Sequence, residues 1–230
     1  MENTKNTCYH CAFKSSAVAT LNQEELNFLG KGCWQTQFKK GELILKEGAP
    51  ANYIAFIREG FVKLVKKGIG GKDFILSISP KGSYLGIQIL NQKSKTYYFS
   101  AAAIAPTEIC FIDIEKFREL LLLNGTFATE VISTIINDEM NYFDRLVNNV
   151  QQQLPGRLAN TLLYFKNQVY HEDSFNLNLT KSELASLIGT SRESVSRLMK
   201  EFQDAGIISA EKNWIHILNE EKLEQIKMKG

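Results

Sequence analysis

The chain has 230 residues, of which 44% are hydrophobic and 23% are charged, and its formal net charge at pH 7 is +2. This composition is that of a globular protein with room for one large and one small domain, and it excludes a disordered or collagen-like chain. Because the net charge is small, affinity for nucleic acid has to come from local groups of Lys and Arg. No apolar run reaches the length of a membrane span and the amino terminus lacks the apolar core of a signal peptide. We therefore expect a cytoplasmic protein with no membrane partner.

The first 21 residues are polar and irregular, and they contain two of the four cysteines, Cys8 and Cys11, at C-x-x-C spacing. In a reducing compartment such cysteines are more often free thiols, metal ligands or redox sensors than structural disulfides. Leucines that recur on one side predict a short helix over residues 22–29.

Residues 33–111 carry short apolar runs that alternate with glycine-bearing turns. Many short strands at close, regular spacing predict an antiparallel β-roll, jelly roll or barrel, within a domain that spans residues 22–125. The order in which the strands pair does not follow from their spacing. A further helix is predicted over residues 115–123.

A long helix is predicted over residues 126–153, because apolar residues recur there at alternating spacings of three and four. This spacing is typical of a coiled-coil seam and favours a parallel dimer helix, although one core helix within a single chain would carry the same stripe. A second apolar line, which includes Val131 and Leu146, favours contacts on two sides. The predicted seam consists of Ile132, Ile136, Met140, Phe143, Val147 and Val150.

Residues 154–230 predict a winged helix-turn-helix domain, so that the whole chain belongs to the α+β class. Pro155 and Gly156 mark its boundary. A helix over residues 157–169 and a polar hairpin near residue 171 come first. Two short helices follow, joined by a tight turn at Gly189. Two strand-like runs around a polar turn at residues 211–213 then form the wing, and a polar helix starts at residue 220.

The second of the two short helices separates apolar from polar residues. Its apolar positions fall at the spacing of a buried stripe, while the opposite face carries Arg192, Glu193, Ser196, Arg197 and Lys200. Arg can form a fork to guanine, Glu can accept from cytosine, and Ser and Lys can reach bases or phosphates in a DNA major groove. An ordinary solvated helix is the simpler alternative. The short preceding helix, the glycine turn and the following wing favour DNA binding.

With a roll, a long helix, a Pro-Gly boundary and a winged helix-turn-helix in this order, the chain resembles the CRP/FNR family of bacterial transcription regulators over nearly its whole length. The resemblance is most specific in LPGRLANTLLYF, residues 154–165, and SRESVSRLMKEFQDAGII, residues 191–208. It implies a cyclic-nucleotide-binding-like roll and a homodimer that binds an inverted-repeat operator in double-stranded DNA and works with RNA polymerase. It also implies base contacts from Arg192, Glu193, Ser196 and Arg197, and phosphate contacts from Thr180, Thr190, Ser191 and Lys200.

The effector pocket departs from the family pattern. The cyclic-AMP branch has a Gly-Glu pair and, about ten residues later, an Arg-Ser pair that hold the ribose and the cyclic phosphate. Here Gly86 matches the glycine, but Ile87 replaces the Glu, and the Arg-Ser pair falls on Tyr97 and Tyr98 or, after a register shift, on the pair that ends at Ser100. A buried phosphate without an arginine would lose a charge-assisted fork and keep its desolvation cost. We therefore expect no cyclic AMP binding. The aromatic residues would fill the pocket, line one for a more apolar ligand, or be ordinary core.

The FNR branch holds an oxygen-sensing [4Fe–4S] cluster with three amino-terminal cysteines and one in the roll. Cys8, Cys11 and Cys110 match three of these positions, whereas Ala17 stands at the third amino-terminal one. Several interpretations stay open: a cluster with a non-standard ligand such as Cys33 or His10, a zinc site, a thiol switch at the C-x-x-C pair, or thiols without a sensing role.

Two other functions are open on the sequence alone. A thiol enzyme of the thioredoxin kind would need its C-x-x-C after a strand and at the start of a helix, but here the motif precedes every predicted strand. The sequence also lacks a Walker loop, H-E-x-x-H and G-x-S-x-G. A ligand-binding roll that regulates a partner protein would leave the predicted base-reading face without a purpose. We therefore expect a transcription regulator without enzymatic activity.

Overall fold

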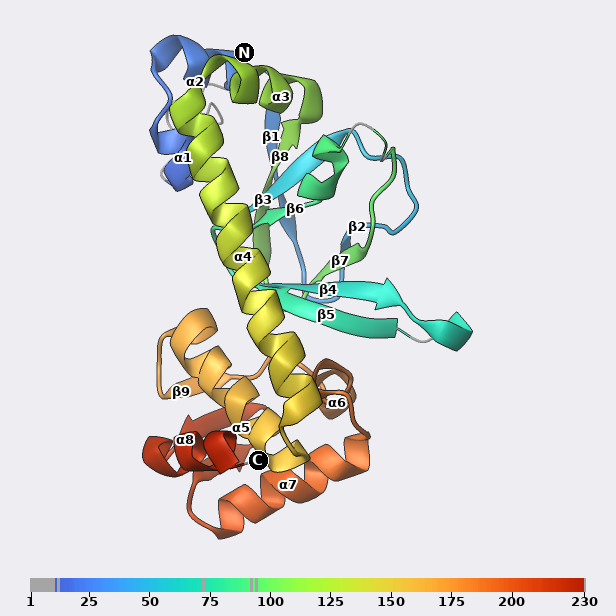
Figure 1. Cartoon of the computed structure of the whole chain (residues 1–230), viewed down its shortest axis with the longest axis vertical. Helices are drawn as coiled ribbons and strands as arrows, with labels where there is room; N and C mark the ends of the chain where they lie inside the picture. The colour runs from blue at the N-terminus through green and yellow to red at the C-terminus, as the bar shows by residue number, and fades with distance from the viewer. Residues whose placement is uncertain (1–10, 12, 72, 92, 94, 230) are drawn as a thin grey trace. The chain divides into compact units, whose positions relative to one another are not determined.

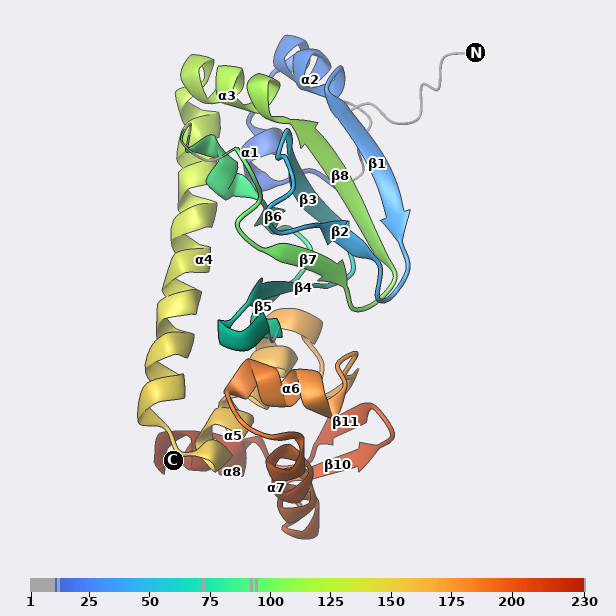
Figure 2. The same ribbon diagram turned by 90° about the vertical axis from the view of Figure 1, so that its right-hand side faces the viewer.

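The computed structural model describes residue 11 and residues 13–71, 73–91, 93 and 95–229. The chain divides into two compact units, one formed by Met1–Lys67 with Ile78–Glu139 and the other by Gly68–Ser77 with Met140–Gly230. Figures 1 and 2 show the elements of each unit in two views.

The roll contains two four-stranded sheets, with strand orders β1-β8-β3-β6 and β2-β7-β4-β5 (Figure 2). All the pairings described between these strands are antiparallel. This confirms the predicted antiparallel roll and supplies the pairing order that the spacing left open. The strands are β1 (Cys33–Phe38), β2 (Leu43–Leu45), β3 (Tyr53–Glu59), β4 (Val62–Lys67), β5 (Asp73–Ser79), β6 (Tyr84–Leu85), β7 (Ser100–Ala103) and β8 (Thr107–Asp113).

Both faces of the first sheet are buried at its centre. The four residues Ile54–Ile57 of β3 are all buried, which explains why this strand is a continuous apolar run instead of an alternating one. Phe117 and Phe127, which lie on helices, are also fully buried in the same core. The helices of this unit are α1 (Ser16–Ala19), α2 (Gln23–Gly30) and α3 (Ile114–Leu123), with a 3₁₀ turn at Ile87–Leu90.

The long helix α4 (Gly125–Gln151) has 27 residues and starts and ends within two residues of its predicted bounds. Only Phe127 and Val131 of this helix are buried. Within the described part of the chain, no single helix is long and apolar enough to cross a membrane, and α3 with α4 passes that test only when the bent pair is taken together.

The second unit contains several helices and a three-stranded antiparallel sheet of order β10-β11-β9, of which Figure 2 labels β10 and β11. Its elements are α5 (Leu154–Tyr164), a π-helical segment (Phe165–Tyr170), β9 (Ser174–Asn176), α6 (Lys181–Ile188), α7 (Arg192–Asp204), β10 (Ile208–Glu211), β11 (Trp214–Ile217) and α8 (Glu220–Lys229).

Two local predictions in this unit are corrected. The helix expected from residue 157 begins at Leu154, because Pro155 lies in its first turn, where a missing N–H costs nothing. The polar hairpin expected near residue 171 is a left-handed turn at His171 that leads into β9, and β9 pairs with β11 as a third strand of the wing sheet. One lysine fixes this region: Lys166 Nζ lies 2.6 Å from a carboxylate oxygen of Asp173 and 2.5 Å from one of Glu220.

Candidate nucleic-acid interface

The two helices of the helix-turn-helix motif lie on either side of the predicted turn at Gly189, and both have well-defined caps. At the start of α6, the Thr180 hydroxyl accepts from the Glu183 backbone N–H, and the Glu183 carboxylate accepts from the backbone N–H of Thr180. Gly189 ends α6 in the left-handed conformation at φ 67° and ψ 49°, a region that favours glycine. Ser191 then caps α7 by accepting from the Ser194 N–H.

The apolar face of α7 fixes how this helix is presented. Val195, Leu198, Met199 and Phe202 are all buried. They lie on α7 at the predicted spacing, and α6 contributes Leu184, Leu187 and Ile188 to the buried residues of the same motif. Burial of one side of α7 leaves its opposite side open to solvent.

The open side of α7 carries the residues predicted to read DNA bases. Arg192, Glu193, Arg197 and Lys200 are exposed, and Ser196 is half-buried; Figure 2 shows α7 as the second helix of the motif. Of the predicted phosphate contacts, Thr180 and Ser191 use their hydroxyls as helix caps, and Thr190 is half-buried.

Glu201 is a charged neighbour of this face that the sequence analysis did not single out. The Nε of Arg197 lies 3.7 Å from a carboxylate oxygen of Glu201, one helical turn further along. The spacing of four residues on one helix could have indicated this pair.

Arg157 is a second residue that the sequence analysis missed. It lies in the first turn of α5, and its Nη1 donates to the Ile188 carbonyl oxygen at 3.0 Å, at the carboxyl end of α6. A methyl group added at Gly189 would lie 3.5 Å from the same nitrogen. Arg157 thus stabilises the turn between α6 and α7 through this hydrogen bond. Its positive charge is also favoured at the carboxyl end of a helix. No spacing pattern could have predicted a contact between residues 31 positions apart.

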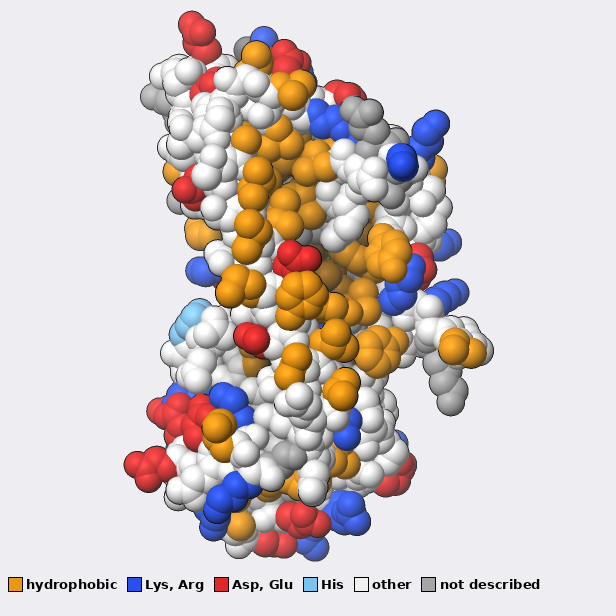
Figure 3. Space-filling view, in the orientation of Figure 1, with side chains coloured by type: hydrophobic (Ala, Val, Ile, Leu, Met, Phe, Trp, Pro, Cys, Tyr) orange, Lys and Arg blue, Asp and Glu red, His pale blue; other side chains and the backbone are white. Residues whose placement is uncertain are grey.

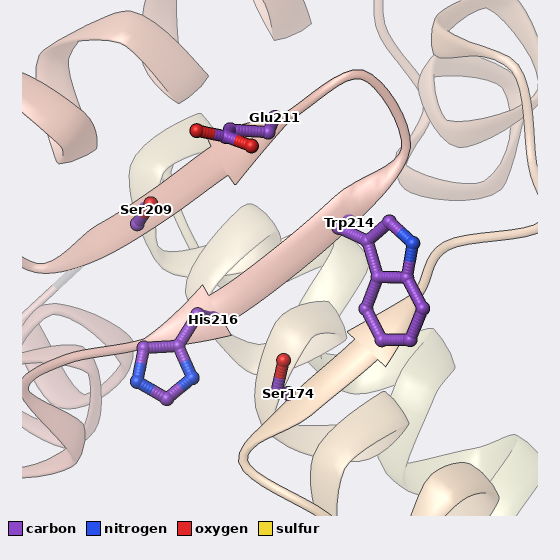
Figure 4. A pocket seen from close by; sticks show the side chains of 5 residues that line it. All are labelled: Ser174, Ser209, Glu211, Trp214 and His216. Atoms are coloured by element: carbon purple, nitrogen blue, oxygen red, sulfur yellow. The ribbon is translucent and has the colours of Figure 1, made fainter.

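The wing follows α7 directly and is tied to it. Gln203, in the last turn of α7, donates through Nε2 to the Ala210 carbonyl oxygen of β10 at 3.2 Å. The outer face of the wing sheet holds a shallow cavity, shown in Figure 4, with residues from all three strands. Its lining consists of Ser174, Ser209, Glu211, Trp214 and His216.

The predicted seam of α4 is open to solvent in the single chain. Apolar side chains gather along the helix in Figure 3. All six residues of the predicted seam, and Tyr142 and Leu146 beside them, are large apolar residues that stay exposed: Ile132, Ile136, Met140, Phe143, Val147 and Val150. Of the second apolar line, Val131 is buried.

Tyr97 occupies the interior of the roll beside Gly86. Its side chain is 8% exposed, and its hydroxyl donates to the Tyr53 carbonyl oxygen at 2.9 Å. A methyl group added at Gly86 would come within 3.0 Å of the Tyr97 ring, so the ring lies directly against the glycine. Burial raises the pKa of the Tyr97 hydroxyl above its usual value. The ring therefore stays neutral at physiological pH.

The other predicted pocket residues do not converge with Tyr97. Tyr98 is 62% exposed, with the Lys66 ammonium 3.9 Å from the centre of its ring. The Ser100 hydroxyl accepts from the Glu47 N–H at 3.0 Å, and Ile87 is a partly buried residue packed against the core. Burial thus alternates along the aromatic residues that precede β7: Tyr97 and Phe99 are buried, and Tyr98 between them is exposed.

Three of the four cysteines lie among the described residues, and two of them, Cys33 and Cys110, are on the neighbouring strands β1 and β8. Cys8 and His10 lie outside the described residues. Cys11 donates its thiol to the Phe13 carbonyl oxygen, Cys33 is half-buried at the start of β1, and Cys110 is buried in β8. Among the described residues, no three His, Cys, Asp or Glu side chains are placed to hold a metal ion together.

Comparison with known proteins agrees with this architecture. A Crp-like helix-turn-helix domain matches residues 156–226, and a cyclic nucleotide-binding domain matches residues 35–124. The cAMP-activated global transcriptional regulator CRP of Salmonella typhimurium is 26% identical over 77% of this chain and 86% of its own length. The transcriptional activator protein anr of Pseudomonas aeruginosa is 25% identical over 79% of this chain and 75% of its own. The structure of FixK2 from Bradyrhizobium japonicum superposes with a TM-score of 0.76 at 18% identity, covering 84% of this chain and 96% of that one.

A roll of the cyclic-nucleotide-binding kind followed by a long helix and a helix-turn-helix domain defines a class of transcriptional regulators, not of enzymes. The chain belongs to the CRP/FNR family of transcriptional regulators.

Proposed function

We propose that this regulator binds DNA in a sequence-specific manner, as a homodimer, at an inverted-repeat operator. The observation that carries the proposal is the exposed face of α7, where Arg192, Glu193 and Arg197 project from a helix whose other face is buried. Such a helix fits the major groove, and its side chains have the donors and acceptors that distinguish base pairs. Its action on DNA would take place in the cytoplasm, together with RNA polymerase.

Within this proposal, Arg192, Glu193, Ser196 and Arg197 read bases. Lys200 is exposed on the same face one turn further along and contacts a phosphate. The hydroxyls of Thr180 and Ser191 already cap the amino termini of α6 and α7. These two residues would therefore contribute to phosphate binding by positioning backbone N–H groups, which can donate to an anion.

The homodimer would form through α4. Six large apolar side chains lie in a row along one exposed face of this helix, which is unfavourable in water. A second copy of the same helix would bury these side chains in a parallel coiled coil. Helix-turn-helix dimers present their recognition helices to half-sites about 34 Å apart, which makes the operator an inverted repeat.

The effector of this protein would not be cyclic AMP. Tyr97 fills the interior next to Gly86. No arginine that could bind a phosphate stands at either of the positions expected from the family pattern. A ligand would have to displace a buried ring and break its 2.9 Å hydrogen bond to Tyr53 before it could enter. Calorimetry with cyclic AMP tests this point, and low-micromolar affinity would contradict it.

Metal binding stays a separate prediction. An iron–sulfur cluster or zinc ion at Cys8, Cys11 and Cys110 would need a fourth ligand as well. Among the described residues, Cys11 and Cys110 do not form a group with a third possible ligand, so Cys8 and the fourth ligand would both have to come close to them. Metal content and visible absorbance of anaerobically purified protein decide between a metal site and free thiols.

A competition experiment tests the DNA assignment. A duplex selected by the wild-type protein from a random pool is compared with a mixed-sequence duplex of the same length. Arg197→Ala should lower affinity for the selected duplex by about 1–3 kcal/mol and relax the preference at one base pair, whereas Lys200→Ala should weaken both duplexes alike. Equal losses on both duplexes for both variants would show that Arg197 does not read a base.

A further inference from the structure

The charges on the exposed face of α7 are balanced, which is unusual for a surface that faces a polyanion. The helix carries three basic and three acidic side chains: Arg192, Arg197 and Lys200 against Glu193, Glu201 and Asp204. All six are exposed. Glu193 has a place in base reading through cytosine. The two acidic residues in the last turns of the helix have no such role, and a carboxylate that is left unpaired there would repel the phosphates of a duplex.

Glu201 does not contribute to helix stability in any evident way. The carboxyl end of a helix favours cations, so acidic residues there are unfavourable. The Arg197–Glu201 pair also has the less favourable order, with the cation on the amino-terminal side of a spacing of four residues. Its side chains are 71% and 57% exposed, so water screens the attraction.

The geometry of the pair leaves the recognition atoms of Arg197 open. Glu201 lies next to Nε, and the two terminal nitrogens of the guanidinium have no partner among the described residues. Those two nitrogens are the fork that can donate to guanine O6 and N7. Arg197 could therefore read a base without leaving Glu201, but it would have to leave Glu201 to reach toward the phosphates.

We propose that Glu201 determines specificity: it holds Arg197 on the helix face, and so lowers the affinity of the protein for DNA that lacks the matching base. The proposal rests on the function proposed above, in which Arg197 reads a base. On non-cognate DNA the pair must break before Arg197 can neutralise a phosphate, and the carboxylate is left close to the backbone. On cognate DNA neither cost arises. Glu201 thus acts through rejection of wrong sequences.

The test uses full-length Glu201→Gln, which keeps the shape and removes the charge. A matched control is Glu224→Gln on α8, which removes the same charge from a pair with Lys227 at 3.1 Å. Affinity is measured by fluorescence anisotropy at several salt concentrations, on the duplex selected by the wild type and on a mixed-sequence duplex of equal length.

Glu201→Gln should tighten binding to the mixed-sequence duplex by roughly two- to fivefold, the range that an exposed ion pair can supply. The slope of log affinity against log salt should steepen there by up to about 0.9, because the released Arg197 neutralises one more phosphate. On the selected duplex the slope should not change, so the ratio of specific to non-specific affinity falls. In an Arg197→Ala background, Glu201→Gln should leave the slope on the mixed-sequence duplex unchanged, and Glu224→Gln should have no effect on either duplex.

Equal tightening on both duplexes, or the same effect in the Arg197→Ala background, would overturn the proposal and show that Glu201 contributes only general charge repulsion. The absence of any change would overturn it as well. A wild-type protein that shows no sequence preference at all would contradict the proposed function itself, which distinguishes the two failures.

Discussion

Tyr97 is the residue on which the proposed lack of cyclic AMP binding depends most. Its buried ring stands at one of the two positions on which the arginine of the family pattern can fall, and it packs against the glycine that the pattern retains. The absence of the arginine could be predicted from the sequence. The burial of Tyr97 and the exposure of its neighbour Tyr98 could not, because a run of three aromatic residues does not indicate which one points inward.

The contribution of Tyr97 to stability can be measured by truncation. Tyr97→Ala should lower the free energy of unfolding by about 3–5 kcal/mol, because it removes a buried ring and leaves a cavity. Tyr97→Phe should cost only about 0.5–1.5 kcal/mol, since it removes the hydrogen bond to Tyr53 alone. Denaturant titration followed by a probe in the roll measures both. Equal stability of the alanine variant and the wild type would mean that the ring is not part of the core.

The contacts of Lys166 with Asp173 and Glu220 make the stability of the second unit depend on pH. Hydrogen bonds to Asp173 and to Glu220 raise the pKa of Lys166, and the bond from Lys166 lowers the pKa of Asp173. A lowered carboxyl pKa adds stability that is present above about pH 4 and is lost as the pH falls through the folded-state pKa. A raised lysine pKa adds stability that is present below about pH 10 and is lost above it.

Between about pH 4 and pH 10, the ion pairs of Lys166 with Asp173 and Glu220 should therefore leave the melting temperature of the second unit unchanged. Below about pH 4 the melting temperature should fall as Asp173 becomes protonated, and it should fall less steeply in the Asp173→Asn variant. The comparison variant is Glu172→Gln, because Glu172 is a neighbouring exposed acid outside the ion pairs of Lys166. An unchanged acid limb in Asp173→Asn would show that solvent screens the contact completely.

At the scale of elements, periodicity predicted the long helix α4 and the two helices on either side of Gly189. The bounds of α6 follow from Thr180, Glu183 and Gly189, which supply a capping box and a left-handed stop within a few residues. The start of α5 and the third strand of the wing were less accessible. A proline suits both a boundary and a first helical turn, and β9 is defined by its pairing with β11, which is distant in sequence.

The seam of α4 makes a prediction about assembly. Phe143→Glu should convert the proposed dimer to monomers, because it would place two carboxylates in an apolar interface without partners. Sedimentation or mass photometry measures the outcome. Leu122→Glu is the matched control, since Leu122 is 86% exposed on α3 and lies outside the seam, and it should leave the dimer intact. A dimer that survives Phe143→Glu would place the interface elsewhere.

At the scale of the whole molecule, the order of elements was predictable and the contacts between distant ones were not. Glycine turns and short apolar runs predicted a roll, but the strand orders depend on long-range pairing that spacing does not encode. The same holds for the candidate site: the charged face of α7 follows from a spacing of three and four, while the support from Arg157 and the tie from Gln203 to the wing depend on the fold. The division into residues 1–21, 22–125, 126–153 and 154–230 stays a prediction.

The central claim is that two copies of this chain recognise one inverted repeat. Selection of duplexes from a random pool by the purified wild-type protein, followed by mass measurement of the complex, tests it most directly. We expect enrichment of two inverted half-sites about one helical turn apart, centre to centre, with two chains on each duplex. A pool without an enriched motif, or a single half-site bound by one chain, would contradict it.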